Sequence, residues 1–268
     1  MSGAGNDFVV VDNRSSIIKD TQSFSKMVCD RRFGVGADGV LLLESSNVAD
    51  FTMKYYNADG SNAGMCGNGG RCISKFAYDL GIVSNNTLTF EGFGHTYSGT
   101  RISDEVYELV MKKPFNVDLN QELVINGLKI IANYVNTGTD HSVIFLGDNS
   151  GLGSLDSVDV IGIGKAIRNH RRYQPLGTNV NFVVITGLNN IKIRTYERGV
   201  EDETLACGTG SVACAILCSI KYGFSSPIIV SVKSGENLEI SFEKNEGGFS
   251  DVRLRGSAKV TFEGELSF

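Results

Sequence analysis

The chain has 268 residues, of which 41% are hydrophobic and 21% charged, the composition of a globular protein with room for about two domains. Its net charge of −5 offers no basic surface to nucleic acid or to an anionic membrane, and no apolar run approaches the roughly 18 residues of a membrane span. Six cysteines without a signal peptide favour a reducing compartment over a disulfide scaffold. We therefore expect a cytoplasmic protein whose partners are neither nucleic acids nor membranes.

The first half of the chain is predicted to contain strands and two helices. The β-branched run at 5–13 (GNDFVVVDN) predicts a strand, and a helical pattern follows at 21–31. Residues 51–56 (FTMKYY) alternate as in a strand, and after nine further residues the segment CGNG at 66–69 opens a helix. A β-rich stretch with Gly and Asn turns follows at 86–102.

The second half repeats most of this pattern. A helical pattern at 158–169 precedes the run NVNFVVITG at 179–187, which resembles 5–13. Residues 191–196 (IKIRTY) alternate, and after ten residues CGTG at 207–210 opens a helix that is almost wholly apolar and is expected to be buried on all sides. A β-rich stretch follows at 227–242.

Internal duplication of this kind predicts two homologous α+β halves. We expect each half to be a mostly antiparallel sheet or barrel around one central helix, with the active site between the halves. The N-terminal half is placed at 1–116, with a last strand at about 258–268 returning to it, and the C-terminal half at 117–257.

Each central helix begins directly after a cysteine, Cys66 or Cys207. A thiol at a helix N-terminus feels the positive end of the helix dipole, which favours the thiolate. The backbone N–H groups of Gly67–Asn68 and Gly208–Thr209 suit a ligand carboxylate. Two such helix starts facing one α-carbon would place a thiol on each side of it, an arrangement suited to removing a proton from one face and returning it to the other.

Other uses of these cysteines fit the sequence less well. No metal site is predicted, because Cys66-x5-Cys72 and Cys207-x6-Cys214 lack the usual spacing of zinc ligands. A disulfide between Cys66 and Cys207 would be an oxidised, inactive form. GVGADG at 34–39 matches a dinucleotide-binding pattern, but a helix precedes it and a strand follows, which is the reverse of the required order. Four cysteines are expected in the core: Cys29, Cys72, Cys214 and Cys218.

A set of polar residues lies at strand ends or in the Gly-rich turns before the helices. Arg198 is available to bind a second carboxylate through two hydrogen bonds. Together these side chains suit a zwitterionic ligand; singly, each also fits a turn-capping Asn or a surface ion pair. The set comprises Asn6, Asn57, Asn179, Glu197 and Arg198.

Four segments together resemble the diaminopimelate epimerase family over essentially the whole chain: GAGNDFVVVDN (3–13), NADGSNAGMCGNGGRC (57–72), GTNVNF (177–182) and ERGVEDETLACGTGS (197–211). The resemblance implies a cytoplasmic enzyme of lysine and peptidoglycan precursor synthesis that interconverts LL- and meso-2,6-diaminopimelate without a cofactor and is often a homodimer. It implies that Cys66 and Cys207 are the acid/base residues. It further implies substrate contacts from Asn6, Asn57, Gly67, Asn68, Asn179, Glu197, Arg198, Gly208 and Thr209.

The chain departs from the family pattern at three places. The family motif G-N-P-H stands here as GTDH at 138–141, so that Thr139 replaces an Asn that contacts substrate, while His141 matches. Some members carry a Gln where this chain has Gly39. Relatives also usually carry a short strand before the segment matching Gly3, so either the start of this chain is truncated or the edge of its first sheet is remodelled.

Two other functions remain alternatives. A proline or hydroxyproline racemase has the same architecture, but those enzymes resemble MCGHG and PCGTG, where this chain has Asn68 and Ala206. A non-catalytic amino-acid binder or thiol redox sensor would be favoured if either cysteine had lost its Gly-x-Gly sequence, and both retain it.

Overall fold

The computed structural model describes residues 1–62 and 64–267. The chain forms two compact units: unit 1 comprises Met1–Val110 and Arg255–Phe268, and unit 2 comprises Met111–Leu254. Strand β16 (Gly248–Ser257) therefore begins in unit 2 and ends in unit 1. The sequence placed these divisions at 116/117 and 257/258, a few residues later in each case.

Unit 1 contains helix α1 (Thr21–Cys29) and helix α2 (Gly67–Asp79), as the sequence predicted. Parallel pairs join β2 to β3 and β4 to β5, whereas β1–β2, β3–β4, β5–β6 and β6–β7 pair antiparallel. The strands lie side by side in chain order: β1 (Ser2–Gly3), β2 (Asn6–Asp12), β3 (Gly39–Glu44), β4 (Phe51–Asn57), β5 (Thr87–Gly92), β6 (His95–Arg101) and β7 (Val106–Val110).

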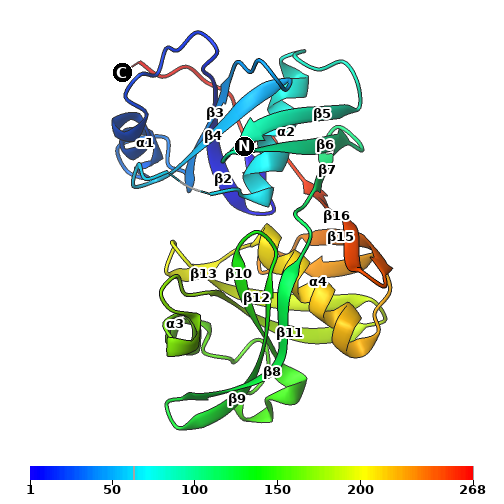
Figure 1. Cartoon of the computed structure of the whole chain (residues 1–268). Helices are drawn as coiled ribbons and strands as arrows, with labels where there is room; N and C mark the ends of the chain where they lie inside the picture. Colours follow the sequence, from blue (N-terminus) through cyan, green and yellow to red (C-terminus); the bar gives the residue numbers. More distant parts are fainter. Residues whose placement is uncertain (63, 268) are drawn as a thin grey trace. The chain divides into compact units, whose positions relative to one another are not determined.

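Helix α2 is held within the curved sheet of unit 1 (Figure 1) and packs against β1, β2, β3, β4, β6 and β7. Its first turn is rich in glycine because the strands approach closely. A Cβ on Gly70 would lie 2.7 Å from Leu109 and 2.9 Å from Met65. The buried face continues through Cys72, Ile73 and Ala77.

Unit 2 contains helices α3 (Val160–Arg168) and α4 (Gly208–Tyr222) and three short 3₁₀ turns, Leu146–Asp148, Ser150–Leu152 and Arg171–Tyr173. Its strand order is β16-β15-β14-β12-β11-β10-β9-β8, with β13 on β12. The strands are β8 (Phe115–Ile125), β9 (Leu128–Asn136), β10 (Asp140–Phe145), β11 (Asn179–Gly187), β12 (Asn190–Glu197), β13 (Asp202–Thr204), β14 (Ile228–Ser231) and β15 (Asn237–Asn245).

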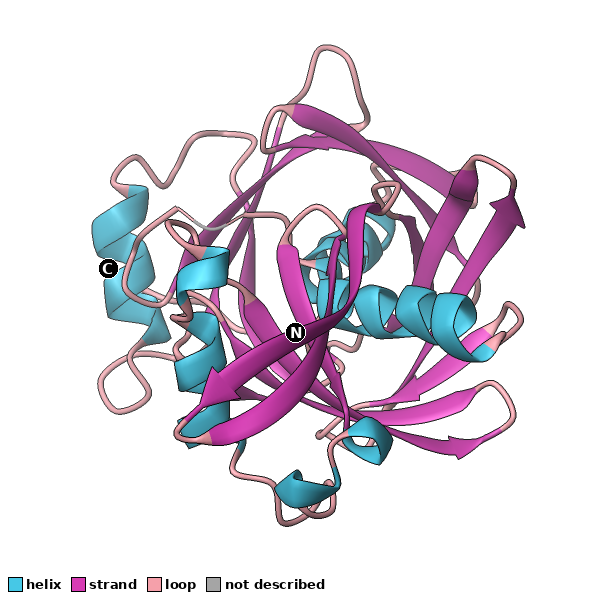
Figure 2. Ribbon diagram, turned by 60° about the horizontal axis from the view of Figure 1, so that its bottom comes forward, coloured by secondary structure: helices cyan, strands magenta, loops and turns pink. Residues whose placement is uncertain are grey.

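Helix α4 is buried on all sides from Gly210 to Ser219, as its nearly continuous apolar sequence predicted. Strands β9, β10, β11, β12, β14 and β15 contact it (Figure 2 shows the helices against the strands). It ends at Gly223, whose φ of 71° is the left-handed conformation that glycine adopts most easily. Cys214 and Cys218 belong to this core, and Cys29 and Cys72 are buried in unit 1, as expected.

The duplication is present, but one predicted correspondence was wrong. The sequence paired the run at 5–13 with that at 179–187, yet β11 corresponds to β3, and the counterpart of β2 is β10. Pairing establishes this: β2 lies parallel to β3 and β3 antiparallel to β4, just as β10 lies parallel to β11 and β11 antiparallel to β12. Buried β-branched strands look alike in sequence, so local similarity selected the wrong partner.

No helix within the described residues is both long enough and apolar enough to span a membrane.

Candidate active site

Cys66 occupies the N-cap position of α2, with extended backbone angles (φ −117°, ψ 120°), and its Sγ accepts a hydrogen bond from the Gly69 N–H at 3.5 Å. A residue in this position faces the unsatisfied N–H groups of the first helical turn. The Cys66 side chain is partly exposed, whereas Gly67 and Asn68 are buried. The predicted cysteine at a helix start is therefore present in unit 1.

Asn6, at the start of β2, lies against this helix start. Its Oδ1 accepts from the Cys66 thiol at 3.8 Å and from the Asn68 amide at 3.5 Å. Its Nδ2 donates to a carboxylate oxygen of Asp38. Since an ionised carboxylate only accepts hydrogen bonds, Asp38 fixes which end of the Asn6 amide faces the cysteine.

Asp38 belongs to a cluster of charges beside β2. Arg31 donates to both carboxylate oxygens of Asp7, each at 2.9 Å, and to Asp38 at 2.9 Å. Burial by itself would raise the pKa of Asp7, but the hydrogen bonds from Arg31 lower it overall. Burial raises the pKa of Asp38, and the neighbouring Asp7 charge adds to this rise.

Arg71 is a cation that is fully buried within unit 1. Its Nη1 donates to the Gly67 carbonyl at 3.1 Å, its Nη2 to Asn68 Oδ1 at 3.0 Å and its Nε to the Ser257 carbonyl at 3.1 Å. Because one of these partners is the side chain of Asn68, Arg71 orients a residue that touches Asn6.

Asn57 ends β4, and its side chain donates to Ser61 Oγ at 3.0 Å within the turn that leads toward Cys66. This places it in the same Gly-rich turn that the sequence singled out.

Cys207 is the N-cap of α4, with nearly the same backbone angles as Cys66 (φ −121°, ψ 111°). It is buried, and its Sγ lies 3.6 Å from the hydroxyl of Thr209. A Cβ added to Gly210 would lie 2.4 Å from Asn181 Oδ1 and 3.2 Å from Cys207 Sγ. Glycine at 210 therefore lets Asn181 pack directly against the start of the helix.

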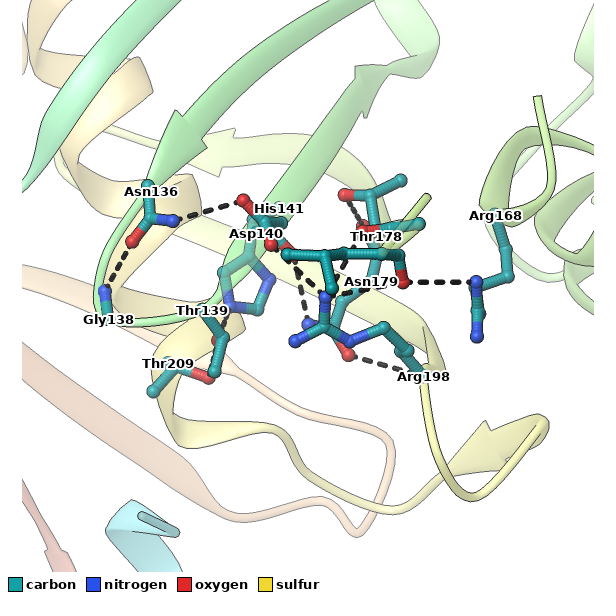
Figure 3. A network of polar contacts seen from close by, with 12 residues as sticks. Asn136, Gly138, Thr139, Asp140, His141, Arg168, Thr178, Asn179, Arg198 and Thr209 are labelled. Carbon is teal, nitrogen blue, oxygen red and sulfur yellow. Dashed lines mark hydrogen bonds and ion pairs between the residues drawn. The ribbon is translucent and has the colours of Figure 1, made fainter. Parts of the chain in front are cut away.

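A chain of polar contacts leads from Cys207 into β10. Thr139 Oγ1 donates to Thr209 Oγ1 at 3.3 Å and lies 2.9 Å from His141 Nε2 (Figure 3). His141 Nδ1 lies 3.2 Å from the amide nitrogen of Asn181. Burial lowers the pKa of His141 to about 3, with a further lowering from Arg198, so the ring is neutral at pH 7.

Arg198 and Asn179 form a second group beside this chain (Figure 3). Arg198 Nη1 pairs with Asp140 at 3.1 Å and donates to the Gly177 carbonyl at 3.1 Å. Asn179 accepts from the Arg198 backbone N–H and donates to the Asp140 carbonyl, each at 2.9 Å. Asn179 thus fixes the backbone of Arg198, while Nε and Nη2 of Arg198 make no hydrogen bond within the described residues.

Glu197 ends β12, and its Oε2 accepts from Thr204 Oγ1 at 2.8 Å. It lies next to Arg198 in the chain, at the end of β12.

Most of the predicted residues thus lie in two clusters, one in each unit. The contacts described for Asn57, to Ser61, and for Glu197, to Thr204, do not join these two residues to either cluster. Sequence reasoning missed several residues that hold the two clusters in place. An acidic residue directly before a buried strand and a charged residue inside a glycine-rich helix start were visible signals for two of them. The missed residues are Asp38, Arg71, Asp140 and Asn181.

Unit 2 also carries an open hollow of about 540 Å³ between β8, β9 and the third 3₁₀ turn. Tyr134 connects this hollow to the second cluster, because its hydroxyl donates to Asp140 at 2.5 Å. The lining residues are Asn116, Val117, Asp118, Gln121, Tyr134, Arg172 and Tyr173. Among the described residues no three His, Cys, Asp or Glu side chains are grouped so as to hold a metal ion.

Two units of mixed sheet, each enclosing a helix capped by a cysteine, define a protein of the racemase and epimerase type of α+β fold. A solved structure described as a probable proline racemase from Agrobacterium radiobacter K84 has this fold, with a TM-score of 0.74 over 98% of this chain and 90% of that chain at 16% identity. The family model for diaminopimelate epimerase matches residues 1–101 and 133–259. The chain belongs to the diaminopimelate epimerase family.

Relatives of similar length support this assignment. The diaminopimelate epimerase of Chlorobaculum tepidum is 41% identical over 273 residues, covering 100% of both chains. That of Aquifex aeolicus is 42% identical over 284 residues, covering 100% of this chain and 96% of the relative.

Proposed function

We propose that the protein is an isomerase that interconverts LL- and meso-2,6-diaminopimelate by moving a proton between two thiols. The observation that carries this proposal is that a chain of the diaminopimelate epimerase family has a cysteine at the N-cap of each of its two enclosed helices. Each thiol stands beside N–H groups that suit a carboxylate.

In this proposal the reacting carboxylate is bound by the backbone N–H groups of Gly67–Asn68 and Gly208–Thr209. These donors stabilise the negative charge that spreads onto the carboxylate when the α-proton leaves. One cysteine, as thiolate, takes the α-proton, and the electron pair of the broken C–H bond stays on the carbon. The other cysteine, as thiol, then donates its proton to the opposite face, so the product leaves with inverted configuration and the proton has changed cysteines.

We propose that the distal end of the substrate is recognised by polar groups of both clusters. Arg198 has Nε and Nη2 available for a carboxylate, and Asp140 holds the guanidinium in place. Asn179 retains a second amide hydrogen and lone pair beyond its backbone contacts. The remaining proposed substrate contacts are Asn6, Asn57, Thr139 and Glu197. His141 is fully buried and its two ring nitrogens face Thr139 and Asn181, so we propose that it orients Thr139 and does not touch the substrate itself.

The reaction as proposed uses no cofactor, because both proton transfers are made by side chains of the chain. We also propose that the enzyme works in the cytoplasm as a homodimer; gel filtration with light scattering tests the dimer, and a monomer mass would contradict it.

The direct test follows the α-proton of LL-diaminopimelate in D₂O by proton NMR, with reduced protein and no added cofactor. Loss of the α-proton signal together with appearance of the meso isomer is expected. L-Proline and 4-hydroxyproline serve as controls. Exchange with proline alone would favour the racemase alternative, and no exchange with any of the three, with both thiols reduced, would refute the proposal.

Substitution of either proposed acid/base residue tests the two-thiol mechanism. Cys66→Ser and Cys207→Ser are each expected to lower kcat by at least about 10²-fold, because general acid/base groups contribute on the order of 10² to 10⁴. Cys218→Ala, a buried cysteine of the same helix as Cys207, is the matched control and is expected to keep most of the activity. Full activity in either serine variant would contradict the mechanism.

A further inference from the structure

The clusters around Cys66 and Cys207 have different side chains at structurally equivalent positions. In unit 1, Phe8 pairs with Gly39 across the parallel strands, and in unit 2 His141 pairs with Asn179. This register makes Asn6 the counterpart of Thr139, two residues before each pair. The helix starts correspond likewise, so Asn68 is the counterpart of Thr209. Unit 1 therefore uses two amides where unit 2 uses two hydroxyls.

In unit 1 the Asn6 side chain that contacts Cys66 presents a hydrogen-bond acceptor to the thiol. The amide nitrogen of Asn6 is turned toward the Asp38 carboxylate, so the oxygen faces Cys66. An amide oxygen only accepts hydrogen bonds, and it therefore favours the protonated thiol. An opposing contribution comes from the Gly69 N–H, which donates to Cys66 Sγ at 3.5 Å.

In unit 2 the direction of the hydrogen bonds follows from Asn181. Its Nδ2 donates to the Ser142 carbonyl at 3.3 Å, which fixes the orientation of the amide. The same nitrogen faces His141 Nδ1, so that ring nitrogen is the acceptor and the hydrogen lies on Nε2. Nε2 then donates to Thr139.

The remaining bonds continue in the same direction. Thr139, which accepts from His141, donates its hydroxyl hydrogen to Thr209. Thr209, which accepts from Thr139, has its own hydrogen to donate to Cys207 Sγ at 3.6 Å. This series of hydrogen bonds thus ends with the Thr209 hydroxyl donating to the sulfur of Cys207, a contact that favours the thiolate.

We propose that Cys207 is the thiolate and Cys66 the thiol in the substrate-free protein, and that Thr139 is the positioning residue that sets this difference through Thr209. The proposal deepens the proposed function and rests on its two acid/base thiols. The resting form is then ready for the epimer whose α-proton faces Cys207.

The charged groups near each thiol are compatible with this assignment. Near Cys66, Arg71 donates hydrogen bonds to the Gly67 carbonyl and to the Asn68 side chain. The Asp38 carboxylate accepts a hydrogen bond from the amide nitrogen of Asn6. Near Cys207 the imidazole of His141 is neutral, the Asp140–Arg198 ion pair lies behind it, and Cys214 of α4 is buried with a pKa raised by burial.

The test measures alkylation of each cysteine by iodoacetamide from pH 5 to 10 without substrate, quantified by mass spectrometry of the two peptides. The midpoint pH reports the thiolate and is independent of how fast reagent reaches the site. We expect a lower midpoint for Cys207 than for Cys66. We expect Thr139→Val to raise the Cys207 midpoint by about half to one pH unit, the size of one hydrogen bond, and to leave Cys66 unchanged. Thr139→Ser, which keeps the hydroxyl, is expected to restore the midpoint.

A second pair of variants, at Thr209, tests the same hydrogen bonds if Thr139→Val fails to fold. Thr209→Val removes the next hydroxyl of the chain and should raise the Cys207 midpoint, whereas Thr209→Ser should not. Because the two hydroxyls act in series, the double Val variant should shift no further than Thr209→Val alone.

The proposal is overturned by a lower midpoint at Cys66, by Val variants that leave Cys207 unchanged, or by equal shifts at both cysteines. The proposed function is tested separately, by α-proton exchange in D₂O. A protein that shows the expected alkylation midpoints but exchanges no α-proton would support this thiolate assignment and refute the epimerase activity.

Discussion

At the residue scale, the buried cation Arg71 holds three hydrogen-bond acceptors of unit 1 in place. Its guanidinium spans three acceptors in different directions: the Gly67 carbonyl, the Asn68 side chain and the Ser257 carbonyl. A lysine ammonium is a compact point charge and cannot reach all three in the same plane. Arg71 therefore fixes both the helix start and the return of the C-terminal segment of unit 1.

We predict that Arg71→Lys lowers the free energy of unfolding by about 1 to 3 kcal/mol, the cost of leaving a buried hydrogen-bonding group unsatisfied. Urea unfolding measures it. Arg14→Lys, which alters an exposed pair with Asp12, is the control and should change stability by less than about 0.5 kcal/mol. Equal effects in the two variants would refute the role of Arg71.

His141 should make stability depend on pH. Its pKa is lowered to about 3 in the folded protein, while an unfolded histidine has its ordinary value near 6.5. Below pH 6.5 the unfolded chain binds a proton that the folded protein does not, so stability falls as pH decreases from about 6.5 toward 3.

We predict a loss of up to about 1.4 kcal/mol per pH unit from this histidine between pH 6 and 5, above the range in which most carboxylates titrate. The slope of unfolding free energy against pH should be smaller in His141→Gln. His95→Gln changes an exposed histidine and should keep most of the slope. An unchanged slope in His141→Gln would show that the ring is not neutral in the folded protein.

At the scale of elements, the starts of α2 and α4 have the same glycines for different reasons. A Cβ on Gly69 would meet the ends of flexible side chains, Leu41 at 3.2 Å and Met53 at 3.4 Å. A Cβ on Gly210 would meet the oriented amide of Asn181 at 2.4 Å. The second contact involves a residue whose hydrogen bonds fix the tautomer of His141, so it has little freedom to move.

Alanine substitution at both positions tests this difference. Alanine favours a helix over glycine by up to about 1 kcal/mol, which offsets the mild crowding at Gly69→Ala. Gly210→Ala should be destabilised by about 1 to 3 kcal/mol through overpacking and should lose activity. Thermal unfolding and initial epimerisation rates measure both; a neutral Gly210→Ala would contradict the tight contact.

The elements themselves were largely predictable because their signals are local. A cysteine and glycines followed by an apolar periodic segment identified α2 and α4, and alternation identified β4 and β12. The pairing of strands depends on residues far apart in the chain, so the match of β2 to β11 was wrong.

The same limit applied to the candidate site. Cys66 and Cys207 were visible beside their glycines, but Asp38 acts on Asn6 across 32 positions and Asn181 on His141 across 40. The orienting partners become visible only when the strands are paired.

At the scale of the whole molecule, the proposed reaction requires both thiols to reach one substrate carbon. If they do, mild oxidation of the substrate-free protein should join Cys66 to Cys207, because disulfides form only when the two Cα atoms come within about 7 Å. We predict loss of activity with formation of a single cross-linked peptide pair, and recovery on reduction. Inactivation without that peptide pair, or cross-linking that leaves activity intact, would argue against shared use of the thiols.

The passage of β16 from unit 2 into unit 1 has a consequence for synthesis of the protein. Unit 2 is one continuous stretch, Met111–Leu254, whereas unit 1 needs the segment from Arg255 onward, including the partner of the buried Arg71 and the bridge from Lys259 to Ser2. Domains usually fold in the order in which the ribosome delivers them. Here the unit whose translation starts first must wait, with α2 incompletely held, until the other unit has emerged.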